Sequence, residues 1–278
     1  MVKEALMYEK WCNTPPFQPF VSRFADSYQE CQVSWNPYCI KKDALFYQFR
    51  TDDNEEAEVG LVPDACLNIL ISLDASDPYA VFYGALLHSE ELKLKPGTTY
   101  FGFKPYSNLG IKSTVVSPHE LVNTSAEFAY AFQNTESLIT NLSEAADFNS
   151  RVRAFTQFAA RNIINDDYLP TFTDYLAVMI CTSYGNIVLN NAYHEIGYSE
   201  RYCCEEFKKC YGISPKQYGS IIRFQNTLKL LVAGSRNDLS TLAVDGGYFD
   251  QSHLARNFKR YTDTSPDRYL KKYQAIHR

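Results

Sequence analysis

The stretch GGYFDQSHLARNFKRYTDTSPDRY, residues 246–269, decides how the C-terminal part of the chain folds. Asp250 can accept hydrogen bonds from the free N–H groups of a helix that begins at Gln251. Asp263 stands where that helix should end, because Asp tolerates the left-handed conformation common at helix ends. Three residues recur at spacings of four and three and form one apolar face: Leu254, Phe258 and Tyr261. The stretch therefore predicts a capped helix with one buried side.

The opposite face of this helix is polar at its start and basic further on. It carries Gln251, Ser252, Ala255, Arg256 and Lys259. Amide, hydroxyl and guanidinium groups hydrogen-bond to base edges in the major groove, and lysines meet phosphates. The helix is therefore predicted to read DNA.

The same pattern occurs about 50 residues earlier. Gly197-Tyr198 precedes Gly247-Tyr248 by 50 residues, and Phe207–Lys209 precedes Phe258–Arg260 by 51. A repeat of this period indicates a duplicated supersecondary unit, and each copy has the order helix, tight turn, helix. The segment 215–232 is predicted to be the helix that joins the two units.

Two such units joined by one helix resemble the DNA-binding domain of AraC/XylS-type bacterial transcription regulators. The resemblance runs from about Asn186 to Tyr273 and is most specific in the second unit. The matching residues there are Ala243, Gly247, Asp250, Ser252, Leu254, Arg256, Phe258, Ser265, Pro266 and Tyr269. The resemblance implies DNA contacts from the second reading helix, through Gln251, Ser252, His253 and Arg256, and from the first, through Arg201, Cys204 and Glu205. Phosphates are expected to be met by lysines such as Lys208 and Lys259.

The first unit departs from the family pattern at four positions. Tyr193 replaces a small residue, and Cys203 replaces Leu. Glu205 and Glu206 stand where Arg and an apolar residue are common. A carboxylate can accept a hydrogen bond from cytosine N4, but it repels phosphates. Two interpretations remain open: Glu205 reads a base, or the first unit contributes little base readout.

Three cysteines lie close together in the first reading helix: Cys203, Cys204 and Cys210. One interpretation is a thiol sensor, because the neighbouring Lys208 and Lys209 favour the reactive thiolate. The other, which we adopt, is that Cys203 and Cys210 are small buried hydrophobic residues on one helix face.

Charge divides the chain into two parts. The net charge is −5, but residues 186–278 carry 14 Lys and Arg against 9 Asp and Glu, whereas residues 1–185 carry 13 against 23. A basic part joined to an acidic part fits a nucleic-acid module joined to a sensor. No apolar run approaches the roughly 20 residues of a membrane span, and the first residues do not form a signal peptide. We therefore expect a cytoplasmic protein with reduced cysteines and, since no Cys/His spacing fits zinc, without metal or cofactor.

The N-terminal part is predicted to be mostly strand up to about residue 106. Four short segments rich in β-branched and aromatic residues lie between turn-forming clusters: Ala44–Arg50, Cys66–Leu73, Tyr79–Leu87 and Thr99–Tyr106. They favour a mostly antiparallel, barrel-like sheet. From Ser117 the chain is expected to turn helical, with helices at 135–146, 147–166 and 170–180 and with Asp147 as a cap.

The predicted fold class is α+β with two domains. Residues 1–166 form a sensor or dimerisation domain, and residues 167–278 form an all-α domain of two helix-turn-helix units joined by a linker helix. Phe101–Tyr106 (FGFKPY), His119–Asn123 (HELVN) and the helices that follow also resemble the sensor-like domain found in some members of the family.

Aromatic side chains crowd the four strand segments. Neighbours along a strand point to opposite faces, so Phe101 and Phe103 should share one face while Tyr100 lies on the other. An open interior lined by such rings would be a small-molecule site. A closed interior would be core, and would leave dimerisation as the role of this domain.

These observations predict a sequence-specific DNA-binding transcription regulator that is controlled by a small-molecule effector in its N-terminal domain. RNA polymerase and a second copy of the chain are the further partners expected. Two alternatives remain: a ligand-binding or catalytic N-terminal domain that the DNA module only localises, and an effector-independent DNA binder. No enzymatic activity is expected, because the sequence lacks a Gly-rich phosphate loop, HExxH and GxSxG.

Overall fold

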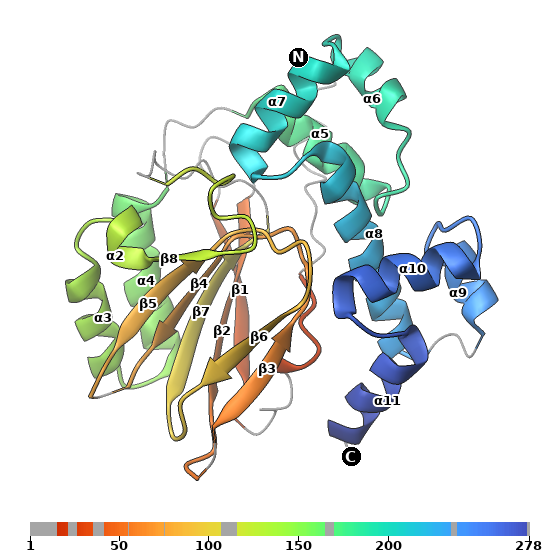
Figure 1. The fold of residues 1–278 in the computed structure, drawn as a ribbon. Coiled ribbons are helices and arrows are strands. Elements are labelled where there is room, and N and C mark those ends of the chain that lie inside the picture. The colour runs from red at the N-terminus through yellow and green to blue at the C-terminus, as the bar shows by residue number, and fades with distance from the viewer. Residues whose placement is uncertain are drawn as a thin grey trace.

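The computed structural model describes residues 16–21, 27–35, 42–54, 56–74, 76–106, 116–164, 170–234 and 238–276. An antiparallel sheet with helices on one side forms the N-terminal part, and helices alone form the C-terminal part (Figure 1). Of the first 20 residues, only 16–20 lie within these ranges. Within the described ranges, no helix is both long and apolar enough to cross a bilayer.

The N-terminal sheets pair only antiparallel strands. The strands are β1 (Gln29–Trp35), β2 (Lys42–Arg50), β3 (Ala57–Leu61), β4 (Asn68–Ser72), β5 (Tyr79–Tyr83), β6 (Glu90–Leu94), β7 (Thr99–Pro105) and β8 (Ser125–Glu127). Six of them form one sheet in the order β1-β2-β7-β4-β5-β8, while β3 and β6 form a separate pair. The predicted barrel-like, antiparallel architecture is confirmed. The main sheet is open and does not close into a barrel. The expectation of helix from Ser117 onward is wrong at β8, which pairs with β5.

The two faces of the main sheet bury different aromatic groups. Phe103 lies opposite Phe46 on β2, and both rings pack on Phe155 of the covering helix at 4.7 and 5.6 Å between centroids. Tyr100 faces the other way and stacks on Phe49 at 5.5 Å. The predicted alternation is thus confirmed, and it separates a closed core on the helix side from the side that faces the C-terminal part.

Three helices close the first of these cores (Figure 1): α2 (Phe128–Ala131), α3 (Thr135–Glu144) and α4 (Phe148–Asn162). The predicted cap of α4 is confirmed, because Asp147 accepts a hydrogen bond from Ser150 N at 2.7 Å. Phe148, Val152 and Phe155 lie on its buried face. The helix ends at Asn162, four residues before the predicted end.

The C-terminal part is all helical, as predicted. Its helices are α5 (Phe172–Thr182), α6 (Leu189–Ile196), α7 (Glu200–Tyr211), α8 (Pro215–Val232), α9 (Leu239–Asp245), α10 (Gln251–Thr262) and α11 (Pro266–Ile276). The pair α6 and α7 lies at one end of α8, and the pair α9 and α10 lies at the other end (Figure 1). The joining helix has the bounds predicted from the sequence, since Ser214 caps it and Pro215 occupies its first turn.

Direct contacts join loops of the N-terminal part to α8. The Gln225 side chain donates to Pro63 O at 2.7 Å and accepts from Phe17 N at 2.9 Å. One hydrophobic cluster continues from the Tyr47 side of the sheet into the core of both helix-turn-helix units. The N-terminal and C-terminal parts are therefore packed directly against each other.

Candidate nucleic-acid interface

Helix α10 is built as its sequence predicts. The Asp250 carboxylate accepts from His253 N at 2.6 Å, and Asp263 ends the helix in the left-handed region with φ 56°. Leu254, Phe258 and Tyr261 are buried. Because this stripe is fixed in the core, the opposite face of α10 is held toward solvent.

The outer face of α10 presents most of the predicted DNA-reading residues. Ser252, Arg256 and Lys259 are exposed. Gln251 is exposed too, and its amide donates to Ser240 Oγ on α9, a bond that it must exchange to reach a base. His253 is half-buried and lies edge-on to the Tyr248 ring at 5.3 Å. The structure thus brings these five side chains to one side of a single helix, from its first residue to its last turn.

Helix α7 presents a different chemistry. Arg201 donates to Glu205 at 2.9 Å, and 88% and 55% of these two side chains are exposed. Cys204 is half-buried, with its Sγ 3.7 Å from the Tyr193 hydroxyl. Lys208 is exposed. The predicted contacts of the first unit therefore lie together, but Glu205 can accept from a base only after its pair with Arg201 opens.

Two of the four departures from the family pattern, Tyr193 and Cys203, lie in the core of the first unit. Cys203 is fully buried and Tyr193 is 4% exposed. Burial raises the pKa of the Cys203 thiol and of the Cys210 thiol above the ordinary value, which disfavours the reactive thiolate. Thr173 Oγ1 donates to Cys210 Sγ at 3.5 Å. Both cysteines thus have the environment expected of packing residues.

Replacing Cys204 by Ser is expected to leave the response of DNA binding to oxidant as it is in the wild type. The reason is that Cys204 packs against Tyr193 in a half-buried position, with its thiol 3.7 Å from the Tyr193 hydroxyl. DNA affinity measured before and after peroxide treatment of both proteins tests this. An oxidant response that the wild type shows and the variant loses would instead make Cys204 a sensor.

The length of α8 sets the separation of the two reading helices. Its 18 residues span about 27 Å at 1.5 Å per residue. Successive major grooves on one side of a duplex lie about 34 Å apart. Because one unit packs at each end of α8, the length of this helix suits two reading helices that enter adjacent major grooves.

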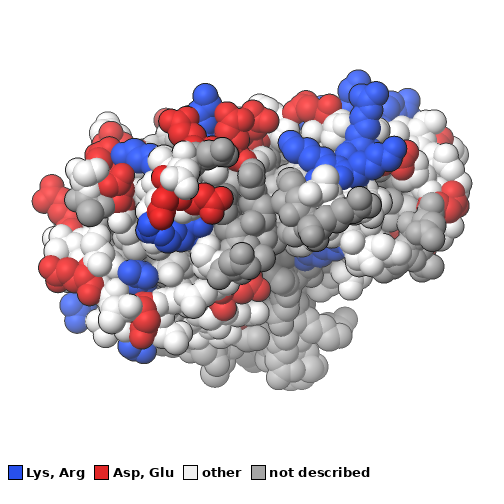
Figure 2. Space-filling view, turned by 90° about the horizontal axis from the view of Figure 1, so that it is seen from below, with Lys and Arg blue, Asp and Glu red and all other residues white. Residues whose placement is uncertain are grey.

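Basic side chains gather over the second unit. Figure 2 shows Lys and Arg concentrated on the side occupied by α8 to α11, whereas Asp and Glu are more frequent over the sheet. In the described part of this unit the exposed cations include Arg256, Lys259, Arg260 and Arg268. This distribution agrees with the charge difference between the two halves of the sequence.

The N-terminal part also contacts the C-terminal caps of both reading helices. His119 Nδ1 donates to Gly212 O, directly after α7, at 3.0 Å. Ser89 Oγ donates to Asp263 Oδ2, directly after α10, at 2.6 Å. Gly212 has φ 77°, and a Cβ there would lie 2.5 Å from Pro118 O. No local sequence pattern indicates these contacts, because each joins residues that are far apart in the chain.

A cavity of about 320 Å³ lies between the Tyr47 face of the sheet, the segment 16–21 and α8. Its lining is mostly apolar with a few polar ends: Pro16, Phe17, Gln18, Val21, Tyr28, Glu30, Leu45, Tyr47, Leu61, Asn68, Lys104 and Lys229. Tyr47 donates to Asn68 Oδ1 at 3.0 Å. Lys104 is buried beside Asp64. The interior on this side of the sheet is therefore open, with the size and lining of a small-molecule site.

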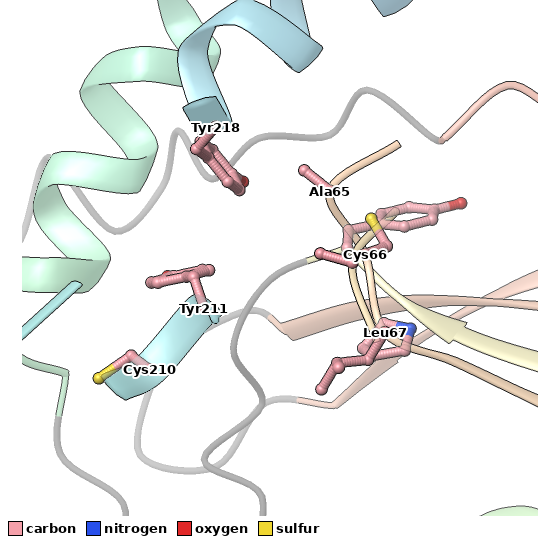
Figure 3. Close-up of a pocket in the computed structure, with 9 residues that line it drawn as sticks. Ala65, Cys66, Leu67, Cys210, Tyr211 and Tyr218 are labelled. Atoms are coloured by element: carbon pink, nitrogen blue, oxygen red, sulfur yellow. The ribbon is translucent and has the colours of Figure 1, made fainter. Parts of the chain in front are cut away.

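A smaller pocket lies between residues 65–67 and the first unit. In Figure 3, Tyr211 and Tyr218 lie on the helical side of the gap, and Ala65 and Cys66 lie on the sheet side. Its volume of about 30 Å³ holds one or two water molecules at most. This pocket is a gap in the packing between the two parts and is too small for an effector.

Residues 193–272 match a family model described as a helix-turn-helix domain. The match covers α7 to α10 and the second half of α6, and it confirms the resemblance of this region to the AraC/XylS-type domain. The C-terminal part of the chain is therefore a double helix-turn-helix DNA-binding domain of that type.

No curated protein sequence matches the chain. Among solved structures, ToxT from Vibrio cholerae (P21 form) is 12% identical, with 88% of this chain and 98% of ToxT covered and a TM-score of 0.43. ToxT from Vibrio cholerae O395 bound to (E)-4-(8-methylnaphthalen-1-yl)but-3-enoic acid is 11% identical, with 89% and 99% covered and a TM-score of 0.44. ToxT from strain SCE256 bound to an unsaturated fatty acid is 11% identical, with 88% and 95% covered and a TM-score of 0.38. Likenesses at this level do not bear on function.

Proposed function

We propose that the protein is a sequence-specific transcription regulator that places α7 and α10 in successive major grooves. The observation that carries this proposal is the outer face of α10, where hydrogen-bonding side chains and cations stand on a helix whose other face is fixed in the core. The proposed base contacts are Gln251, Ser252, His253 and Arg256 in the second unit. Arg201, Cys204 and Glu205 are the proposed contacts of the first unit, with Lys208 and Lys259 on phosphates.

Selection of bound sequences from random DNA by the full-length protein tests the proposal. Recovery of one enriched site that spans two major grooves is the expected result. Enrichment of no sequence at low salt would contradict the proposal.

Replacing Arg256 by Ala is expected to cost about 1–3 kcal/mol of binding free energy and to relax selection at one base pair, because a bidentate contact to guanine is lost. Replacing Lys259 by Ala should weaken all sequences alike. Competition assays with the selected site, its single-base variants and unrelated DNA measure both effects. If the Arg256 variant loses affinity equally for all of these sequences, Arg256 contacts a phosphate.

We further propose that the 320 Å³ cavity binds the small molecule that controls DNA binding. Lys229 of α8 lines the cavity together with Tyr47 and Lys104 of the sheet, so an occupant touches the helix that joins both reading units. The hydrogen bonds of Gln225 to Phe17 and Pro63 lie on the same helix. A bound molecule can therefore alter the position of α8 relative to the sheet, and with it the two units.

A ligand that binds only the folded protein raises stability by RT ln(1 + [L]/Kd), about 2.7 kcal/mol at a hundredfold excess over Kd. We expect some small apolar compounds with a polar end to raise the melting temperature of the full chain and to change its DNA affinity. Leu61→Trp, which narrows the cavity, should abolish both effects. Val116→Trp, at a half-buried position away from the cavity, is the matched control. A flat screen would favour the effector-independent alternative.

A filled interior would have favoured a DNA binder without an effector. The open cavity therefore argues against that alternative. The titratable groups among its described lining residues are Tyr28, Glu30, Tyr47, Lys104 and Lys229, and Lys104 is already paired with Asp64, so we assign the cavity to binding rather than to catalysis. RNA polymerase and a second copy of the chain remain proposed partners on the AraC/XylS resemblance. Action on chromosomal DNA would place the protein in the bacterial cytoplasm.

A further inference from the structure

Phe249 exposes 92% of its surface, more than any other large hydrophobic residue in the described part of the chain. It follows the buried Tyr248 and precedes Asp250, the cap of α10. Folding gains almost nothing from an aromatic ring in water, since burial is what makes an apolar side chain stabilising. The ring is therefore available to a partner.

The backbone on both sides of Phe249 is fixed. Gly247 supplies the turn with φ 73°, and Tyr248 N donates to Ala243 O at 2.8 Å. The Tyr248 hydroxyl donates to Asn257 Oδ1 at 3.0 Å, and Asp250 binds the first turn of α10. Phe249 is thus held outward at a set position immediately before the reading helix.

In a helix-turn-helix protein the N-terminal residues of the reading helix contact base edges. Phe249 stands two residues before Gln251, where α10 begins, so it continues the proposed DNA surface at its leading end. The side chains that follow it, Gln251, Ser252 and Arg256, recognise polar groups. In the major groove, the one apolar group that a base pair offers is the C5-methyl of thymine, and Phe is one of the side chains that contact it.

We propose that Phe249 reads a thymine by packing its ring against the C5-methyl group, at the edge of the site bound by α10. The proposal rests on the proposed function of the chain as a sequence-specific DNA binder. It adds an apolar contact to the polar contacts that the family resemblance implies, and it predicts a thymine preference at one position of the site.

Deoxyuridine differs from thymidine only in lacking the C5-methyl group, so replacing one by the other tests this contact directly. The site selected by the wild-type full chain is remade with each thymine replaced singly by deoxyuridine. At one position the wild type should lose about fourfold in affinity, the amount that corresponds to one buried methyl or methylene group. Phe249→Ala should bind the thymine site about fourfold more weakly and should not distinguish thymine from deoxyuridine at that position.

Val244→Ala is the matched control. Val244 is 73% exposed near the end of α9 in the same unit, five residues before Phe249 and outside the proposed base contacts, and the variant should keep the wild-type sensitivity to deoxyuridine. Phe249→Leu keeps an apolar side chain and should keep part of that sensitivity. Circular dichroism checks that each variant is folded.

Three results overturn the proposal. In the first, Phe249→Ala keeps the full sensitivity of the wild type to deoxyuridine, which leaves the proposed function intact. In the second, Phe249→Ala loses affinity equally for the selected site and for unrelated DNA, which makes Phe249 a backbone contact. Failure of the wild type to select any site overturns this proposal and the proposed function together.

Discussion

Replacing Lys104 by Met is expected to lower the free energy of unfolding by about 3–5 kcal/mol, because it leaves a buried charge without its partner. Lys104 Nζ donates to Asp64 Oδ2, and only 7% and 6% of the two side chains are exposed. Burial, the largest single influence, lowers the pKa of Lys104, but the charge of Asp64, the neighbouring Tyr47 and Cys66 and the hydrogen bond to Asp64 together outweigh it, so this pKa lies above its ordinary value. In the variant, the remaining described donors to Asp64 are the Gln18 amide and Cys66 N.

The pH dependence separates this cause from a simple loss of packing. The ammonium of Lys104 stabilises the wild type fully below the unfolded pKa of about 10.4, and this stabilisation is lost only as the pH rises through the raised folded value. In the Lys104→Met variant, a buried carboxylate without its cation binds a proton more readily. The deficit in urea unfolding should therefore be smaller at pH 5 than at pH 7.

The double variant Lys104→Met with Asp64→Asn is the control for this prediction. It removes both charges and keeps an acceptor for Cys66 N, so most of the lost stability should return, as it does when buried pairs are replaced together. Equal stability of the single variant and the wild type at pH 7 would show that the pair contributes nothing to the folded state.

The helical half of the fold was predictable because its signals are local. A cap at Asp250, apolar residues at helical spacing and a left-handed Asp263 lie within 14 residues, and the observed helix has the bounds they imply. The same holds for α8, with Ser214 before Pro215. Each signal acts on the backbone a few residues away, so distant parts of the chain do not change it.

β1, β3, β6 and β8, which lie outside the four predicted strand segments, carry weaker local signals. β1 and β6 contain several Gln and Glu residues, and they form an edge or a separate pair in which most described side chains are exposed or half-buried. β8 has three residues and forms only because β5 offers it an edge more than 40 residues earlier. Strand pairing depends on such distant partners, so polarity and propensity along one short segment do not reveal it.

The candidate site likewise has some features that local sequence patterns predict and others that depend on distant residues. The outer face of α10 follows from helical spacing, and the Arg201–Glu205 pair has the spacing of four that favours such pairs on a helix. The contacts of His119 with Gly212 and of Ser89 with Asp263 join residues 93 and 174 positions apart. Neither these contacts nor the cavity beside α8 could be derived without the arrangement of the two parts in space.

DNA affinity is expected to fall steeply with salt, although the chain carries a net charge of −5. We expect exposed cations of the DNA-binding domain to contact phosphates, among them Lys208, Lys216, Lys259 and Arg260. Each neutralised phosphate releases counterions, so log K changes with log salt at about −0.9 per contact. With 6–10 contacts the loss between 50 and 200 mM salt would be about 10³–10⁵.

The sign of the salt dependence of DNA affinity shows which charges govern binding. If the net charge of the whole chain repelled DNA, salt would screen the repulsion and affinity would rise. If the basic surface of α7 to α11 meets phosphates directly, affinity falls, and Lys259→Ala reduces the slope by about one. Lys93→Ala is the matched control, because Lys93 is exposed on β6 of the acidic half and should leave the slope unchanged. Titrations by fluorescence anisotropy at four salt concentrations measure all three slopes. A slope near zero in the wild type would mean that the cations of the second unit do not touch the duplex, and the assignment of α10 to the major groove would then fail.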